Sequence, residues 1–143
     1  DLKKAIEEFT LEGVRLLLAE DNDVNAEIAI EIMEMEGAVL ERACDGLEAV
    51  RMFEESPEHG YDAILMDIQM PNMNGWEAAA QIRKSARPDA DIPIFAMSAN
   101  AFVEDKRHSI EIGMNGHISK PVDYDEVREL VGEALLSHGR RGV

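Results

Sequence analysis

Several polar side chains whose types suit phosphoryl chemistry follow short apolar runs of the sequence. They are Glu20, Asp21, Asp67, Ser98 and Lys120. A carboxylate can attack phosphorus, a lysine can stabilise charge on the transferred group, and a hydroxyl can donate a hydrogen bond to it. Three neighbouring carboxylates need a raised pKa or a bound cation, and hard oxygen ligands suit Mg²⁺ (or Mn²⁺). The residue types therefore predict a cation site, although Glu20 and Asp21 alone would also fit the N-terminal cap of a helix.

These side chains can meet only if the apolar runs before them are neighbouring strands. Each run is too short for a helix and is bounded by polar or turn residues. The predicted strands cover residues 14–19, 38–43, 61–66, 92–97 and 116–119. Longer segments with helical spacing lie between the strands. In the first of them Val24, Ile28, Ile32 and Met35 recur at that spacing before Gly37.

Strands that alternate with helices predict an α/β fold whose parallel sheet is covered on both faces. We expect a flavodoxin-like doubly wound (βα)5 domain with a five-stranded parallel sheet of order 2-1-3-4-5. In such folds ligands bind at the carboxyl ends of the strands, where the polar side chains fall. Asp62 stands at the other end of the third strand, about 16 Å away at ~3.3 Å per residue, and receives no role.

Composition excludes several classes of protein. The 143 residues suffice for one domain, and the formal net charge of −16 opposes binding to nucleic acid or to an anionic membrane surface. The single cysteine, Cys44, cannot form an internal disulfide, and no apolar run approaches the roughly 20 residues of a membrane span. We therefore expect a cytoplasmic domain without direct membrane contact, which could still be the cytoplasmic part of a membrane-bound sensor.

Four segments of the sequence together resemble a known family. They are Leu17–Asn22, Met66–Gly75, Ala96–Asn100 and Ser119–Pro121. In order, spacing and position after the strands they resemble the receiver domain of two-component response regulators, over about residues 13–137. The details are most similar to the receivers of hybrid sensor histidine kinases.

The resemblance implies a role for each matching residue. Asp67 is the expected phosphoacceptor, and Mg²⁺ would be held by the acidic pair, by Asp67 and by one backbone carbonyl. The implied metal set is thus Glu20, Asp21, Asp67 and the carbonyl of Gln69. Ser98, with Ala99 beside it, resembles the switch hydroxyl, and Lys120 resembles the phosphoryl-binding lysine. The bond between Lys120 and Pro121 is expected to be cis.

His117 departs from the family pattern, in which a Tyr or Phe usually stands three residues before the lysine. An imidazole ring that moves inward together with Ser98 would make the switch dependent on pH. The alternative is an exposed strand residue with no part in switching. Both interpretations remain open at this point.

The expected function is that of a phosphoacceptor, with no enzymatic activity beyond assisting its own phosphorylation and dephosphorylation. A histidine kinase or a histidine phosphotransfer domain would donate the phosphate, docking where Asn25, Ile28 and Ala29 adjoin the site. Phosphorylation would then repack the surface formed by the helix expected at about residues 103–112, the strand at 116–119 and the last helix, which begins after Asp123. That surface or an N-terminal helix could form a homodimer. Residues 1–12 are expected to be a helical connector or extension, and residues 138–143 a tail. The parent chain is either a hybrid histidine kinase, which the resemblance favours, or a stand-alone regulator.

Two alternatives differ in class. The first is a receiver-like protein-interaction module that is never phosphorylated. The second, a phosphohydrolase with an Asp nucleophile, is less favoured, because Gln69 stands where such enzymes carry a second Asp as general acid.

Overall fold

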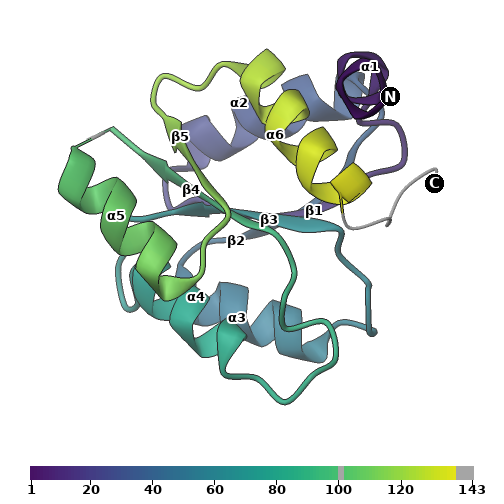
Figure 1. Ribbon diagram of the computed structural model, residues 1–143. Coiled ribbons are helices and arrows are strands. Elements are labelled where there is room, and N and C mark those ends of the chain that lie inside the picture. The colour runs from purple at the N-terminus through teal and green to yellow at the C-terminus, as the bar shows by residue number, and fades with distance from the viewer. Residues whose placement is uncertain (100–101, 138–143) are drawn as a thin grey trace.

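The computed structural model describes residues 1–99 and 102–137 (Figure 1). Its five strands are β1 Arg15–Ala19, β2 Val39–Ala43, β3 Ala63–Asp67, β4 Ile94–Ser98 and β5 Gly116–Ser119. All neighbouring pairs are parallel, and the strand order is β2-β1-β3-β4-β5. The doubly wound fold and the strand order predicted from the sequence are confirmed.

Helices connect all the strands and also stand at both ends of the described chain. They are α1 Leu2–Glu8, α2 Asp23–Met35, α3 Gly46–Glu55, α4 Gly75–Arg83, α5 Val103–Ile112 and α6 Tyr124–Ser137. Several begin at the side-chain caps expected of Asn and Asp. Asn22 caps α2, Asp45 caps α3, and Asn74 forms a capping box with Glu77 at the start of α4.

Two layers of helices enclose the sheet and produce two apolar cores. Figure 1 shows α2 and α6 on one face and α3 and α4 on the other. Met33 of α2 and Leu135 of α6 are buried in the first core, and Phe53 of α3 and Ile82 of α4 in the second. Because both of their faces are covered, β3 and β4 are buried along their whole length.

The α2 helix forms as predicted, but the residues that revealed its period lie mainly on its outer side. Val24 is 63% exposed, Ile28 47% and Met35 82%. The side that faces the sheet carries Ala26, Ala29 and Met33 instead. Small residues next to the sheet let the helix approach it closely, and in the described structure this leaves an apolar stripe of α2 exposed.

The N-terminal helix α1 packs against α6 at the far end of the chain. Phe9, which follows α1, lies over Gly132 of α6 so closely that a Cβ at position 132 would be 2.8 Å from the Phe9 ring. Leu11 is fully buried in the core beneath. The first residues are therefore joined to the domain by packing as well as by the chain.

Some residues expected to matter fall outside this description. Asn100 belongs to one of the matching segments, and the tail at 138–143 was expected to follow the last helix; both lie outside the described residues. Among the residues that are described, no helix is both long and apolar enough to cross a membrane.

Candidate functional site

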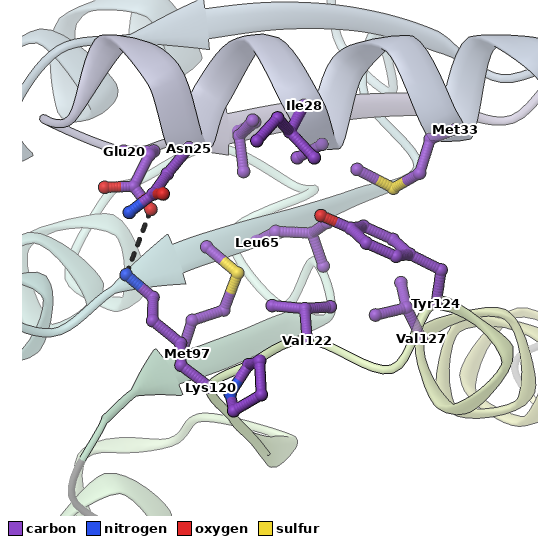
Figure 2. Close-up of a pocket in the computed structure, with 13 residues that line it drawn as sticks. Glu20, Asn25, Ile28, Met33, Leu65, Met97, Lys120, Val122, Tyr124 and Val127 are labelled. Carbon is purple, nitrogen blue, oxygen red and sulfur yellow. Dashed lines mark hydrogen bonds and ion pairs between the residues drawn. The ribbon is translucent and has the colours of Figure 1, made fainter.

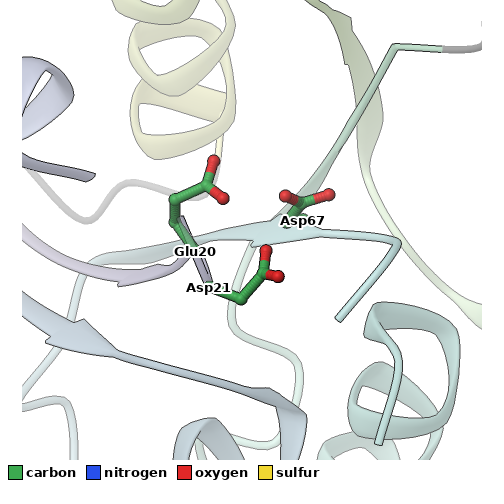
Figure 3. A group of neighbouring side chains, drawn as sticks. All are labelled: Glu20, Asp21 and Asp67. Atoms are coloured by element: carbon green, nitrogen blue, oxygen red, sulfur yellow. The ribbon is translucent and has the colours of Figure 1, made fainter. Parts of the chain in front are cut away.

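Three carboxylates meet at the carboxyl edge of the sheet, as Figure 3 shows. Glu20 and Asp21 begin the loop after β1, and Asp67 is the last residue of the neighbouring β3. One carboxylate oxygen from each lies within 4.8 Å of the others. Glu20 and Asp67 are buried, whereas Asp21 is exposed. These hard oxygen donors, open to solvent on the Asp21 side, fit a cation such as Mg²⁺ that keeps several waters.

Lys120, directly after β5, supplies a positive charge to two of these carboxylates. Its Nζ donates to Asp67 Oδ2 at 2.8 Å and to Glu20 Oε1 at 3.0 Å. Burial lowers the pKa of Lys120, but its hydrogen bonds to Asp67 and Glu20 outweigh that effect and the net pKa is raised. The ammonium is therefore charged at neutral pH. The peptide bond between Lys120 and Pro121 is cis.

The loop after β3 brings Gln69 to the same edge. The backbone N–H of Gln69 donates to Asp67 Oδ1 at 3.2 Å. The chain then turns sharply into α4, where Gly75 lies against the carbonyl group of Asp67. A Cβ at position 75 would be 2.3 Å from that oxygen, so only glycine permits this close approach.

The end of β4 forms the wall beside Asp67. Ser98 is buried, Ala99 is exposed, and Ser98 lines an opening shared with Asp21 and Gln69. The Ser98 carbonyl accepts from the backbone N–H of Lys120 at 2.9 Å, which joins the ends of β4 and β5. The residues expected to bind phosphoryl oxygen thus line one edge with the carboxylates.

His117 lies in β5, and its ring nitrogens are both buried. Neither nitrogen has a hydrogen-bond partner among the described residues. Burial lowers the pKa of His117, Lys106 lowers it further, and Asp105 acts in the opposite direction. The interpretation of His117 as an exposed residue is therefore wrong, although its role in switching stays a prediction.

An apolar cavity of about 490 Å³ adjoins the site between α2 and the start of α6. Figure 2 shows Ile28 and Met33 on the α2 side, facing Val122 and Tyr124. The ion pair between Glu20 and Lys120 closes one end of this cavity. The apolar wall thus continues from the carboxylate cluster to the exposed stripe of α2.

The sequence interpretation missed Arg42 in β2. Its guanidinium donates to the carbonyl oxygen of Glu20 and to the side chain of Asp23. The only sequence signal for it was a basic residue near the carboxyl end of a strand next to β1. No motif pointed to it.

Comparison with known proteins agrees with this geometry. A family model for the response regulator receiver domain matches residues 16–132. Probable histidine kinase 2 of rice (Oryza sativa subsp. indica) is 36% identical over 140 residues, which covers 90% of this chain. The match is only 13% of that relative's own length, so the chain spans a small part of it.

Solved structures with the same fold include receivers bound to a metal or to a partner protein. The receiver domain of sensor histidine kinase PA1611 from Pseudomonas aeruginosa, with magnesium in its active-site cleft, is 34% identical with a TM-score of 0.73. That match covers 83% of this chain and 94% of the other. The receiver of Ssk1 from Saccharomyces cerevisiae, co-crystallised with the phosphotransfer protein Ypd1, is 30% identical with a TM-score of 0.71, over 83% and 85% of the two chains.

Proposed function

The chain belongs to the family of response regulator receiver domains, and from that premise we propose that Asp67 accepts a phosphoryl group from a phosphohistidine. One observation carries the proposal. The Asp67 carboxylate lies within 4.8 Å of two further carboxylates and 2.8 Å from the Lys120 ammonium, at the edge of the sheet where such folds bind ligands.

In the proposed step an oxygen of Asp67 attacks phosphorus as the bond from phosphorus to the donor's imidazole nitrogen breaks. The imidazole leaves with the bonding electron pair and takes up a proton, and Asp67 becomes an acyl phosphate. Lys120 pairs with Asp67 before the reaction and can then pair with a phosphoryl oxygen. We expect Ser98, with Ala99 beside it, to donate a hydrogen bond to a second phosphoryl oxygen.

We assign the cation to Glu20, Asp21, Asp67 and the backbone carbonyl of Gln69. Mg²⁺, or Mn²⁺ in its place, would neutralise charge on the transferred group. Glu20 already shares Lys120 with Asp67, so we expect it to orient the cluster as much as to bind the metal. The PA1611 receiver, which holds magnesium in its cleft, supports this assignment by analogy.

The donor is proposed to be a histidine kinase or a histidine phosphotransfer domain that docks on α2. Exposed Val24 and Ile28 supply an apolar surface there, and the cavity beside Ile28 leads to Lys120. Helical phosphotransfer domains can cover such a stripe with an apolar helix face. The complex of Ypd1 with the Ssk1 receiver is a precedent for this class of partner.

The response to phosphorylation is proposed to pass through α5, β5 and α6. His117 lies in β5, next to α5, and Val103 and Ile110 expose apolar surface on α5. A homodimer would use this surface or α1. We further propose that residues 1–12 connect the domain to a kinase core in a hybrid histidine kinase, and that the segment itself has no turnover activity.

Phosphorylation by a small donor tests the proposal. Acetyl phosphate with Mg²⁺ should add one phosphate per chain, as counted by intact-mass spectrometry. Asp67→Asn should abolish the addition, because it removes the attacking carboxylate. Asp62→Asn, at the opposite end of the same strand, is the matched control and should retain it.

Other outcomes identify the alternatives. A phosphohistidine-bearing phosphotransfer domain that leaves the chain unlabelled in the presence of Mg²⁺ would favour the unphosphorylated interaction module. Continuous release of phosphate from an added ester, beyond one equivalent per chain, would indicate a phosphohydrolase. Labelling of Asp67→Asn would refute the assignment of the phosphoacceptor.

A further inference from the structure

Arg42, near the end of β2, binds both sides of the loop that carries Asp21. Its Nε and Nη2 donate to the carbonyl oxygen of Glu20 at 3.0 and 2.8 Å. Its Nη1 donates to Asp23 Oδ1 at 2.8 Å. Glu20 and Asp23 flank the pair Asp21 and Asn22, so one planar guanidinium fixes the chain before and after Asp21.

The Asp21 side chain has little else to hold it. It is exposed, and within the part of the chain that the structure describes no hydrogen bond reaches its carboxylate. Its position therefore depends on the backbone around it. That backbone is tied to β2 by the bond from Glu20 N to the Ala43 carbonyl at 3.1 Å and by the contacts of Arg42.

We propose that Arg42 is a positioning residue for the divalent cation, which it serves by holding Asp21 within reach of Glu20 and Asp67. The inference rests on the proposed function, because it assigns a supporting residue to the same site. Ordering a flexible loop costs backbone entropy. If Arg42 already orders the loop before the cation binds, cation binding does not carry that cost. Residues that orient metal ligands in this way typically change metal affinity 10–100-fold when they are replaced.

The charge of Arg42 makes the proposal unusually easy to test. A guanidinium near the cluster repels Mg²⁺, so its charge by itself weakens binding. Its hydrogen bonds to the loop strengthen binding by the argument above. Replacement by a neutral residue therefore changes affinity in opposite directions according to which effect dominates.

Isothermal titration calorimetry with MgCl2 on the whole chain separates the two effects. Arg42→Gln should raise the Kd for Mg²⁺ by about tenfold, since loss of order outweighs loss of repulsion. Arg42→Lys keeps the charge but loses the forked geometry, and should fall between Arg42→Gln and the wild type. Arg51→Gln is the matched control: an exposed arginine on α3 paired with Glu48 and Glu55, whose removal should leave the Kd unchanged.

A second measurement needs no metal. Amide hydrogen exchange at residues 20–23 should accelerate in metal-free Arg42→Gln and remain slow in Arg51→Gln. A Kd for Arg42→Gln equal to or below that of the wild type would overturn the positioning role. If the wild type itself binds no Mg²⁺, the cation part of the proposed function fails. Hydrogen exchange then still decides whether Arg42 orders the loop, and unchanged exchange would overturn that as well.

Discussion

Carboxylates are buried at both the amino and the carboxyl edge of the sheet, but the partners of these carboxylates differ between the two edges. At the amino edge, Asp62 accepts from the backbone N–H of Arg15 at 2.8 Å and from its guanidinium at 3.2 and 3.4 Å. Nearby, Asp89 accepts from the backbone N–H of His59 at 2.8 Å and from Arg87 at 2.9 and 3.1 Å. Each buried acid there has an arginine of its own.

The carboxyl edge is arranged differently. Glu20 and Asp67 share one ammonium, that of Lys120, and no basic side chain of residues 1–99 or 102–137 forms an ion pair with Asp21. A lysine is a compact charge on a flexible stem, whereas arginine binds a carboxylate through a rigid fork. The carboxyl edge can therefore exchange partners during a reaction, and the amino edge cannot.

Asp89 shows how strongly a buried acid of the amino edge is held by its arginine partner. The hydrogen bond from Arg87 lowers the pKa of Asp89 to about 2, with a smaller contribution from the His59 N–H. Arg87 also donates to the carbonyl groups that end α3 and lies over the Phe53 ring. Buried acids thus stabilise the fold at one edge and remain available for chemistry at the other.

The largest expected effect is a loss of stability on removing an arginine partner at the amino edge. Arg87→Met keeps part of the apolar stem but leaves Asp89 buried without a cation. We expect the free energy of unfolding, measured by urea denaturation, to fall by about 3–5 kcal/mol. Phosphorylation of the chains that remain folded should be unchanged. A loss below about 1 kcal/mol would mean that solvent reaches Asp89 and that the two edges differ less than we argue.

A smaller effect concerns His117, whose two ring nitrogens are buried and have no hydrogen-bond partner within the described part of the chain. Because burial lowers its pKa in the folded chain, the unfolded chain takes up a proton first as the pH falls below about 6.5. Stability should therefore be full above that pH and decline below it, by at most about 1.4 kcal/mol per pH unit. Lys106 and Asp105 face the ring with opposite effects on this pKa.

His117→Phe isolates this contribution. Urea denaturation at pH 7.5 and pH 5.5 should show a smaller loss of stability for His117→Phe than for the wild type. If His117 also takes part in switching, chemical shifts on phosphorylation should differ between pH 6 and pH 8 in the wild type alone. Equal losses of stability in the two proteins would indicate that the ring is solvated or finds a partner.

The smallest effect is expected at the carboxyl edge and has the opposite sign. Asp21→Asn removes one of three crowded charges, and without Mg²⁺ it should raise the free energy of unfolding by about 0.5–1 kcal/mol. The same change should abolish tight Mg²⁺ binding. Urea denaturation in EDTA and in MgCl2 measures both consequences. Destabilisation in EDTA would show that Asp21 contributes to the fold and is not simply held ready for a cation.

The strands and most of the candidate site could be predicted from the sequence, because the fold depends on local patterns. Short apolar runs ended by polar residues located every strand to within two residues, and the parallel sheet then brought Glu20, Asp67 and Lys120 together. Strand ends are informative because their neighbours are set by topology and not by side-chain packing.

Features that depend on packing could not be predicted in the same way. The period of Val24, Ile28 and Met35 identified a helix, but alanines pack against the sheet and the apolar stripe faces outward. Arg42 and Arg87 bind backbone carbonyl groups of distant segments. Such contacts produce no recognisable residue spacing in the sequence, because every residue has a backbone carbonyl oxygen that can accept a hydrogen bond.

The close packing of Phe9 against Gly132 couples the position of α1 to that of α6. Since position 132 carries no side chain, α1 rests directly on α6, and the start of the chain lies on the α6 side of the domain. Because the two helices are in direct contact, we expect a tilt of α6 to move α1 with it. We expect a bulky residue at position 132 to displace Phe9 and α1 from α6 and to leave the carboxylates at the carboxyl edge of the sheet in place.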